Sequence, residues 1–99
     1  MSADSSISCA EILKVLADET RLGVVRLLMS GPLHVGEINK QLQVEPTLLS
    51  HHLRILREAG VVESRRDGKA VLYRLSLQVE SQRRDKVLEL GCCRLDFSE

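Results

Sequence analysis

Aromatic side chains are almost absent from this sequence. Its 99 residues include one tyrosine, Tyr73, one phenylalanine, Phe97, and no tryptophan. Proteins that bind single-stranded nucleic acid commonly stack the bases on aromatic rings. The composition therefore disfavours a single-stranded partner, and any nucleic-acid partner is expected to be double-stranded DNA.

Long apolar runs are absent as well. No stretch approaches the roughly 18 apolar residues that a membrane span needs. The first six residues, MSADSS, carry an acid and no basic segment followed by an apolar one, so they do not resemble a secretory leader. We expect no membrane partner and a cytoplasmic location. The length allows one core, so residues 1–99 are expected to form a single domain.

Net charge is also missing, since 14 basic residues balance 14 acidic ones. The two signs are unevenly placed along the chain. Residues 1–20 hold one basic and four acidic residues, whereas residues 54–75 hold six basic and three acidic ones. A local basic stretch is the usual footprint of a nucleic-acid-binding surface. The neutral total is therefore weak evidence against DNA binding.

Cysteine is scarce and odd in number, with Cys9, Cys92 and Cys93. An odd count in a protein expected in a reducing compartment disfavours a disulfide framework, so we expect three thiols. Metal binding, redox chemistry and burial as small apolar residues all remain open for them.

Apolar periodicity predicts four helices in the first 60 residues. Ser8 and Glu11 form a capping-box pattern at the start of the first, and Pro46 suits the first position of the fourth. The expected helices cover residues 9–17, 19–29, 35–42 and 46–60. In the fourth, a buried stripe is indicated by three leucines at i, i+4 and i+7, namely Leu49, Leu53 and Leu56.

After Gly60 the pattern becomes extended. Residues 61–64 and 70–75 are β-prone and bracket Asp67-Gly68, a strong hairpin signal with a cationic tip. From about residue 77 to 91 a charge-rich, weakly amphipathic pattern predicts a last helix.

Two short helices joined by a tight turn and followed by a basic hairpin have the order of a winged helix-turn-helix. The predicted fold is thus mainly α with a β-hairpin wing, in the order α-α-α-α-β-β-α. The second helix of such a pair presents side chains to base edges in the major groove, and the wing reaches phosphates. The candidate DNA-contacting residues are Thr47, Leu48, Ser50 and His51 near the start of the fourth helix, and the cations Arg54, Arg57, Arg65, Arg66 and Lys69.

His51 and His52 are neighbours on the fourth helix, so they lie about 100° apart and only one faces outward. We assign the outward position to His51. His34 is expected in an exposed loop or at a helix cap. Ser50 does not face either neighbouring histidine, and no carboxylate is placed to orient them, so we expect no enzyme.

Several segments together resemble the ArsR/SmtB family of bacterial repressors. They are LADETRL at 16–22, LSHHLRILREAGVV at 49–62, RDGK at 66–69 and YRL at 73–75. The resemblance spans about residues 9 to 90. It implies a homodimer that pairs through its first and last helices, binds an inverted-repeat operator and leaves when an inducer binds.

The resemblance also limits which residues could form the inducer site. The zinc site of some relatives needs Asp and His in the last helix, but no histidine follows His52. The soft-metal site of others needs cysteines in the third helix, and residues 33–37 contain none. The remaining candidate is the pair Cys92 and Cys93, which resembles the vicinal cysteines near the chain end of some arsenic-sensing relatives.

Trivalent arsenic or antimony prefers thiolates, and Cys9 is a candidate third ligand beside Cys92 and Cys93 from either protomer. We expect As(III) or Sb(III) as inducer and no obligatory cofactor. Two alternatives stay open. One is a repressor of the same fold whose cysteines sense peroxide or persulfide, with Arg94 favouring the thiolate. The other is a winged-helix protein-interaction module without DNA binding.

Overall fold

A computed structural model describes residues 8–98. The first six residues, whose composition bears on a leader, lie outside this range. Five helices are present: α1 (Cys9–Leu16), α2 (Glu19–Leu28), α3 (Val35–Leu42), α4 (Pro46–Glu58) and α5 (Leu77–Ser81). The strands are β1 (Leu33–His34), β2 (Val62–Asp67), β3 (Ala70–Leu75), β4 (Arg83–Arg84), β5 (Val87–Glu89) and β6 (Arg94–Asp96). None of the described helices is long and apolar enough to cross a membrane.

Side-chain caps fix the starts of three helices. Ser8 accepts a hydrogen bond from the Glu11 amide at α1, and Asp18 accepts one from the Arg21 amide at α2. At α4 the carboxylate of Glu45 accepts the amide of Leu48 at 2.9 Å. Each cap satisfies a backbone N–H that has no partner within its helix. The expected starts of these helices are confirmed to within a residue.

The core forms where α2, α3 and α4 meet the base of the wing. On α4 the stripe of Leu49, Leu53 and Leu56 is at most 1% exposed, as predicted. The stripe belongs to one cluster with Val25 of α2 and Ile38 of α3. Burial of such side chains contributes about 1.5–3 kcal/mol each, so the orientation of α4 is fixed mainly by this face.

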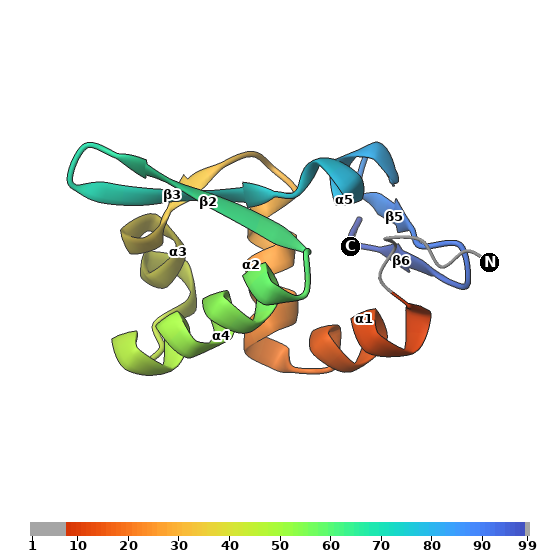
Figure 1. Cartoon of the computed structure of the whole chain (residues 1–99), viewed down its shortest axis with the longest axis horizontal. Coiled ribbons are helices and arrows are strands. Elements are labelled where there is room, and N and C mark those ends of the chain that lie inside the picture. The colour runs from red at the N-terminus through yellow and green to blue at the C-terminus, as the bar shows by residue number, and fades with distance from the viewer. Residues whose placement is uncertain (1–7, 99) are drawn as a thin grey trace.

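The wing is a three-stranded antiparallel sheet in the order β1-β3-β2. Its hairpin pairs Val62 with Leu75 at the base and Asp67 with Ala70 at the tip. Gly68 follows Asp67 with a φ of 67°, the left-handed conformation that glycine adopts without strain. The predicted hairpin is confirmed. In Figure 1 it projects over α3, at the end of the molecule away from α1.

The last helix begins at Leu77 as predicted, but its predicted extent to about residue 91 is wrong. Only α5, five residues long, is helical in this part of the chain, and β4, β5 and β6 form a second antiparallel sheet in that order. Residues 80–86 include no apolar side chain, so a helix through them would have no face to bury. Instead Asp85 adopts a φ of 58° in a turn, and Leu88 is buried from a strand. The long helix predicted to take part in dimerisation is therefore reduced to the five residues of α5.

Both ends of the described chain meet on one side of the molecule. Figure 1 shows α1 next to β5 and β6, opposite the wing tip. The Sγ atom of Cys9, the first residue of α1, lies 3.8 Å from the carbonyl oxygen of Leu90, just after β5. The C-terminal sheet therefore closes onto the start of the first helix.

The leucine stripe of α4 makes a testable stability difference. Leu53→Ala leaves a cavity at a site that is 1% exposed, so it is expected to lower the free energy of unfolding by about 2–5 kcal/mol. Leu48→Ala, on the same helix but 46% exposed, serves as the control and should stay within about 0.5 kcal/mol. Urea unfolding measures both. Equal effects of the two substitutions would contradict the orientation of α4.

Candidate nucleic-acid interface and thiol cluster

The outer face of α4 is polar and unobstructed. All six of the α4 residues predicted to contact DNA are exposed: Thr47, Leu48, Ser50, His51, Arg54 and Arg57. His52 faces inward and is 8% exposed, so the assignment of His51 as the outward histidine is confirmed. This face presents hydroxyl, imidazole and guanidinium groups along one helix. Whether they contact DNA stays a prediction.

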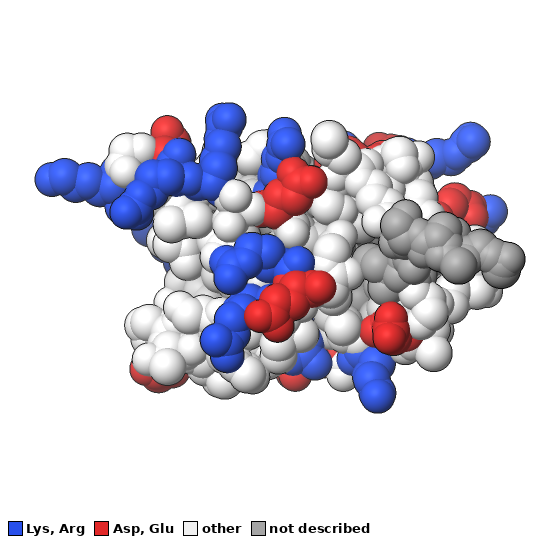
Figure 2. Space-filling view, viewed as in Figure 1, with Lys and Arg blue, Asp and Glu red and all other residues white. Residues whose placement is uncertain are grey.

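The wing adds a second set of cations beside this helix. Arg65, Arg66 and Lys69 are exposed, and none of them pairs with an acidic side chain in the described range 8–98. Arg74, in contrast, forms an ion pair with Glu63 at 3.0 Å. Figure 2 shows basic side chains gathered on the projecting wing, while red and blue are interleaved over the middle of the molecule. The projecting wing therefore presents a group of exposed, unpaired cations.

His34 ties the wing to the helix-turn-helix, a role that the sequence did not reveal. As expected, it lies at a cap, preceding α3. Its Nε2 lies 2.7 Å from Oδ2 of Asp67 at the wing tip, and its Nδ1 lies 3.1 Å from Oε1 of Glu37. The hydrogen bond to Asp67, followed by that to Glu37, raises the pKa of His34 above its usual value of 6.5. The imidazolium thus bridges two carboxylates.

The three cysteines come together within one chain. Their sulfur atoms all lie within 4.8 Å of one another, with Cys9 from α1 and Cys92 and Cys93 from the connection between β5 and β6. We call this set the thiol cluster. No other such group of His, Cys, Asp or Glu side chains is found in residues 8–98. Sequence reasoning could not decide from which protomer Cys9 comes, and here a single protomer supplies all three.

Two of these cysteines are not free thiols in the structure. Cys9 and Cys92 form a disulfide with a Cα–Cα distance of 6.3 Å, inside the usual range. Cys93 remains free and half-buried. Sequence predicts three thiols but not this proximity, which arises because the closed C-terminal sheet brings residues 83 positions apart into bonding range.

The cation that follows the thiol cluster in sequence is already paired with a carboxylate. Arg94, expected to favour a thiolate, is engaged with Glu89, since its Nε lies 2.7 Å from Oε2 of that carboxylate. Cys92 is exposed, whereas Cys9 and Cys93 are half-buried. Once reduced, the three sulfurs offer a converging, solvent-accessible set of soft ligands. Such a set fits a thiophilic ion of low coordination number.

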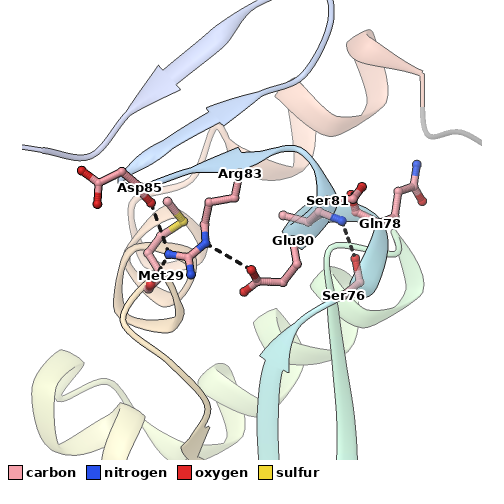
Figure 3. Close-up of polar contacts among 8 residues, drawn as sticks. Met29, Ser76, Gln78, Glu80, Ser81, Arg83 and Asp85 are labelled. Carbon is pink, nitrogen blue, oxygen red and sulfur yellow. Dashed lines mark hydrogen bonds and ion pairs between the residues drawn. The ribbon is translucent and has the colours of Figure 1, made fainter.

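The C-terminal sheet is joined to α2 through one guanidinium. Arg83 donates from Nη1 to the carbonyl oxygens of Met29, the C-cap of α2, and Asp85, and from Nε to Glu80 at 3.2 Å (Figure 3). A cation at this position satisfies a helix-terminal carbonyl and favours the negative end of the helix dipole. The sheet that holds Cys92 and Cys93 is thus anchored to a central helix of the fold.

Comparison with known proteins agrees with this architecture. Residues 18–64 match the model of the bacterial regulatory protein, arsR family. A biofilm growth-associated repressor from Xylella fastidiosa strain 9a5c is 35% identical over 85 residues, which cover 86% of this chain and 75% of that protein. The chain belongs to the ArsR family. It is therefore related to DNA-binding transcriptional regulators and not to enzymes.

Two further similar proteins bear on the function and on the oligomeric state. The arsenical resistance operon repressor of Escherichia coli K12 is 46% identical over 67 residues, which cover 67% of this chain and 57% of that protein. The homodimeric winged helix-turn-helix DNA-binding domain of Mb0332 from Mycobacterium bovis superposes with a TM-score of 0.65 at 33% identity, covering 70% of this chain and 64% of that one.

The family match does not include the thiol cluster. Residues 18–64 contain α2, α3, α4 and the beginning of the wing, and all three cysteines lie outside this range. Membership of the ArsR family therefore supports the DNA-reading elements. The inducer has to be argued from the cluster itself.

The bridge at His34 predicts a pH dependence. Because the folded pKa is raised, the stabilisation is fully present well below the ordinary histidine pKa of about 6.5, and is lost as pH rises through the folded value. Asp67→Asn should lower the His34 pKa and reduce stability at pH 6 more than at pH 9. NMR titration of the imidazole signals measures this, with His51 as an internal control. An unchanged His34 titration in D67N would contradict the bridge.

Proposed function

We propose that this protein is a dimeric transcriptional repressor that acts in the cytoplasm, binds an inverted-repeat operator, and is released when trivalent arsenic or antimony binds the thiol cluster. The observation that carries the inducer assignment is the convergence of Cys9, Cys92 and Cys93 within 4.8 Å. The DNA assignment rests on the exposed polar face of α4 beside the unpaired wing cations.

The residues in the first turns of α4 contact the bases. Hydroxyl and imidazole groups at Thr47, Ser50 and His51 can donate to or accept from base edges in the major groove. Leu48, 46% exposed, offers an apolar contact of the kind that recognises a thymine methyl group. Phosphate contacts fall to the cations, which set affinity and register rather than sequence choice: Arg54, Arg57, Arg65, Arg66 and Lys69.

A dimer provides the second reading head that an inverted repeat requires. Helix-turn-helix dimers contact half-sites about 34–36 Å apart, which is one turn of DNA. The Mycobacterium bovis domain, 33% identical to this chain, is homodimeric. In this protein α1 keeps its proposed place at the interface, since Leu13 on its surface is 42% exposed. The short α5, which carries Leu77 at 66% exposure, replaces the long helix expected there.

Inducer binding is a ligand exchange at three sulfurs. Reduced Cys9, Cys92 and Cys93 each give up a proton and form a sulfur–arsenic bond, while the three hydroxyl groups of arsenous acid leave as three water molecules. The product is a trigonal As–S₃ unit, which suits a soft centre. The relative from Escherichia coli is named an arsenical resistance operon repressor, which supports this choice of inducer. The Cys9–Cys92 bond must be reduced first.

The thiol cluster is placed to affect DNA reading. One ligand begins α1, and the other two lie in the connection between β5 and β6 of the C-terminal sheet, which Arg83 anchors to the end of α2. Gathering the three sulfurs around one atom would therefore shift α1 and the C-terminal sheet, both of which pack next to the helix-turn-helix. A coupling of about 1–3 kcal/mol between inducer and operator is typical of such linked sites.

A second candidate uses the same sulfurs as a redox switch, favoured by the pairing of Cys9 with Cys92. Peroxide would oxidise one thiol to a sulfenic acid and release water. The second thiol would then displace a second water to close the disulfide, so that two electrons pass from the thiols to the peroxide. In this reading oxidation itself releases the operator.

Salt dependence tests the phosphate contacts. Arg66→Ala is expected to weaken binding to operator and unrelated duplex alike, and to lower the slope of log affinity against log salt by about 1. Arg94→Ala, which removes a cation from the C-terminal sheet, is the matched control and should leave the slope unchanged. Fluorescence anisotropy over a salt series measures both. If wild type binds no duplex even at low salt, the interaction-module alternative replaces the repressor.

Arsenite release tests the inducer. On the reduced protein at fixed salt, arsenite is expected to weaken operator binding about 5- to 150-fold in wild type, and to have little effect on Cys9→Ser, Cys92→Ser or Cys93→Ser. Ser81→Ala is a control outside the cluster. Equal release of wild type and the cysteine variants would contradict the As–S₃ site. Release by peroxide without any response to arsenite would establish the redox candidate in its place.

A further inference from the structure

A buried polar contact joins the recognition helix to α1 and α2. His52 of α4 lies on the inner face, is 8% exposed, and receives a hydrogen bond at its Nδ1 from Nη1 of Arg21 at 3.0 Å. Arginine can only donate, so this nitrogen is the acceptor and the His52 proton sits on Nε2. Among the otherwise apolar residues on this face, His52 is the polar exception.

Arg21 reaches three helices at once. Its Nε donates to the carbonyl oxygen of Val15 near the end of α1 at 2.6 Å, and its own backbone amide donates to Asp18, the N-cap of α2, at 3.0 Å. The same carboxylate of Asp18 lies 3.8 Å from Nδ1 of His52. One guanidinium therefore fixes the relative placement of α1, α2 and α4.

This contact controls the rotation of α4 about its own axis, which the leucine stripe alone does not fix. Apolar packing is non-directional and tolerates small rotations of a helix about its axis, whereas a hydrogen bond weakens steeply away from its preferred geometry. His51 and His52 are successive residues, so a rotation that moves one moves the other by the same angle. Holding His52 inward thereby sets the direction of His51 on the outer face.

We propose that Arg21 and His52 are positioning residues for base reading: their hydrogen bond sets the rotation of α4 and hence the aim of Ser50 and His51 into the major groove. This inference rests on the proposed DNA binding and is independent of the inducer. It assigns a role to His52 that neither its burial nor the leucine stripe explains. The pair acts through other residues and does not itself contact DNA.

The test compares specific with non-specific DNA. Wild type selects an inverted-repeat duplex from a random library, and affinities are then measured for that duplex and for a scrambled one of equal length. His52→Leu removes the acceptor and is expected to weaken binding to the selected duplex about tenfold, the size of one misplaced base contact, with binding to the scrambled duplex unchanged. His52→Asn, which keeps an acceptor near the Nδ1 position, should recover most of the loss.

A lysine substitution supplies an independent arm. Arg21→Lys keeps the charge but replaces the two fixed donor nitrogens that contact Val15 and His52 with a single ammonium nitrogen, so it too should lose selectivity. Arg26→Lys, the same change at an exposed position of α2, is the matched control. The thermal midpoint of each variant is recorded. If H52L does not fold, R21K against R26K carries the test alone.

The outcomes separate this inference from the proposed function. A wild type that selects no duplex would contradict DNA reading itself. A selective wild type whose H52L and R21K variants are equally selective would overturn the positioning role while leaving the repressor intact. Equal losses on selected and scrambled DNA would also overturn it, because a purely structural role lowers both together.

Discussion

The packing of α4 against α2 is the constraint on which the remaining surfaces depend. Its inner leucines, at most 1% exposed, can be buried only if the opposite side of the helix faces solvent. The 3.6-residue period then places Thr47, Ser50 and His51 on the outer face. The wing base packs into the same cluster through Val62 and Leu75, so the cationic hairpin takes its direction from the same core.

A second constraint closes the chain on itself. The C-terminal sheet brings Cys92 and Cys93 to the first residue of α1, and Arg83 holds that sheet to the end of α2. The thiol cluster therefore lies between the start of α1 and the β5–β6 connection, and Figure 1 shows these elements at the end of the molecule away from the wing tip. In the proposed function, a ligand at the thiol cluster acts on α1 and on the contact with the end of α2, and leaves the outer face of α4 free for DNA.

The parts that sequence predicted well are those with local signals. The leucine period of α4, the N-cap at Asp18 and the Asp67-Gly68 hairpin are each encoded within a few residues. The extent of the last helix is not predictable in this way, because charge-rich segments suit helices in general, whereas residues 80–86 lack the apolar face that a packed helix would need. The pairing of Cys9 with Cys92, the bridge from His34 to Asp67 and the contact of Arg21 with His52 join residues 31 to 83 positions apart. No local pattern encodes such pairs, since they exist only once the core has assembled.

The central claim is that one protomer alone supplies three sulfur ligands to a trivalent metalloid. X-ray absorption at the arsenic edge, on reduced protein loaded with one equivalent of arsenite per chain, tests it most directly. We expect three sulfur neighbours for each arsenic atom in wild type, and two sulfurs with one oxygen in Cys9→Ser. Arsenic surrounded by oxygen alone in wild type, or a sulfur count that is unchanged by removing Cys9, would contradict it.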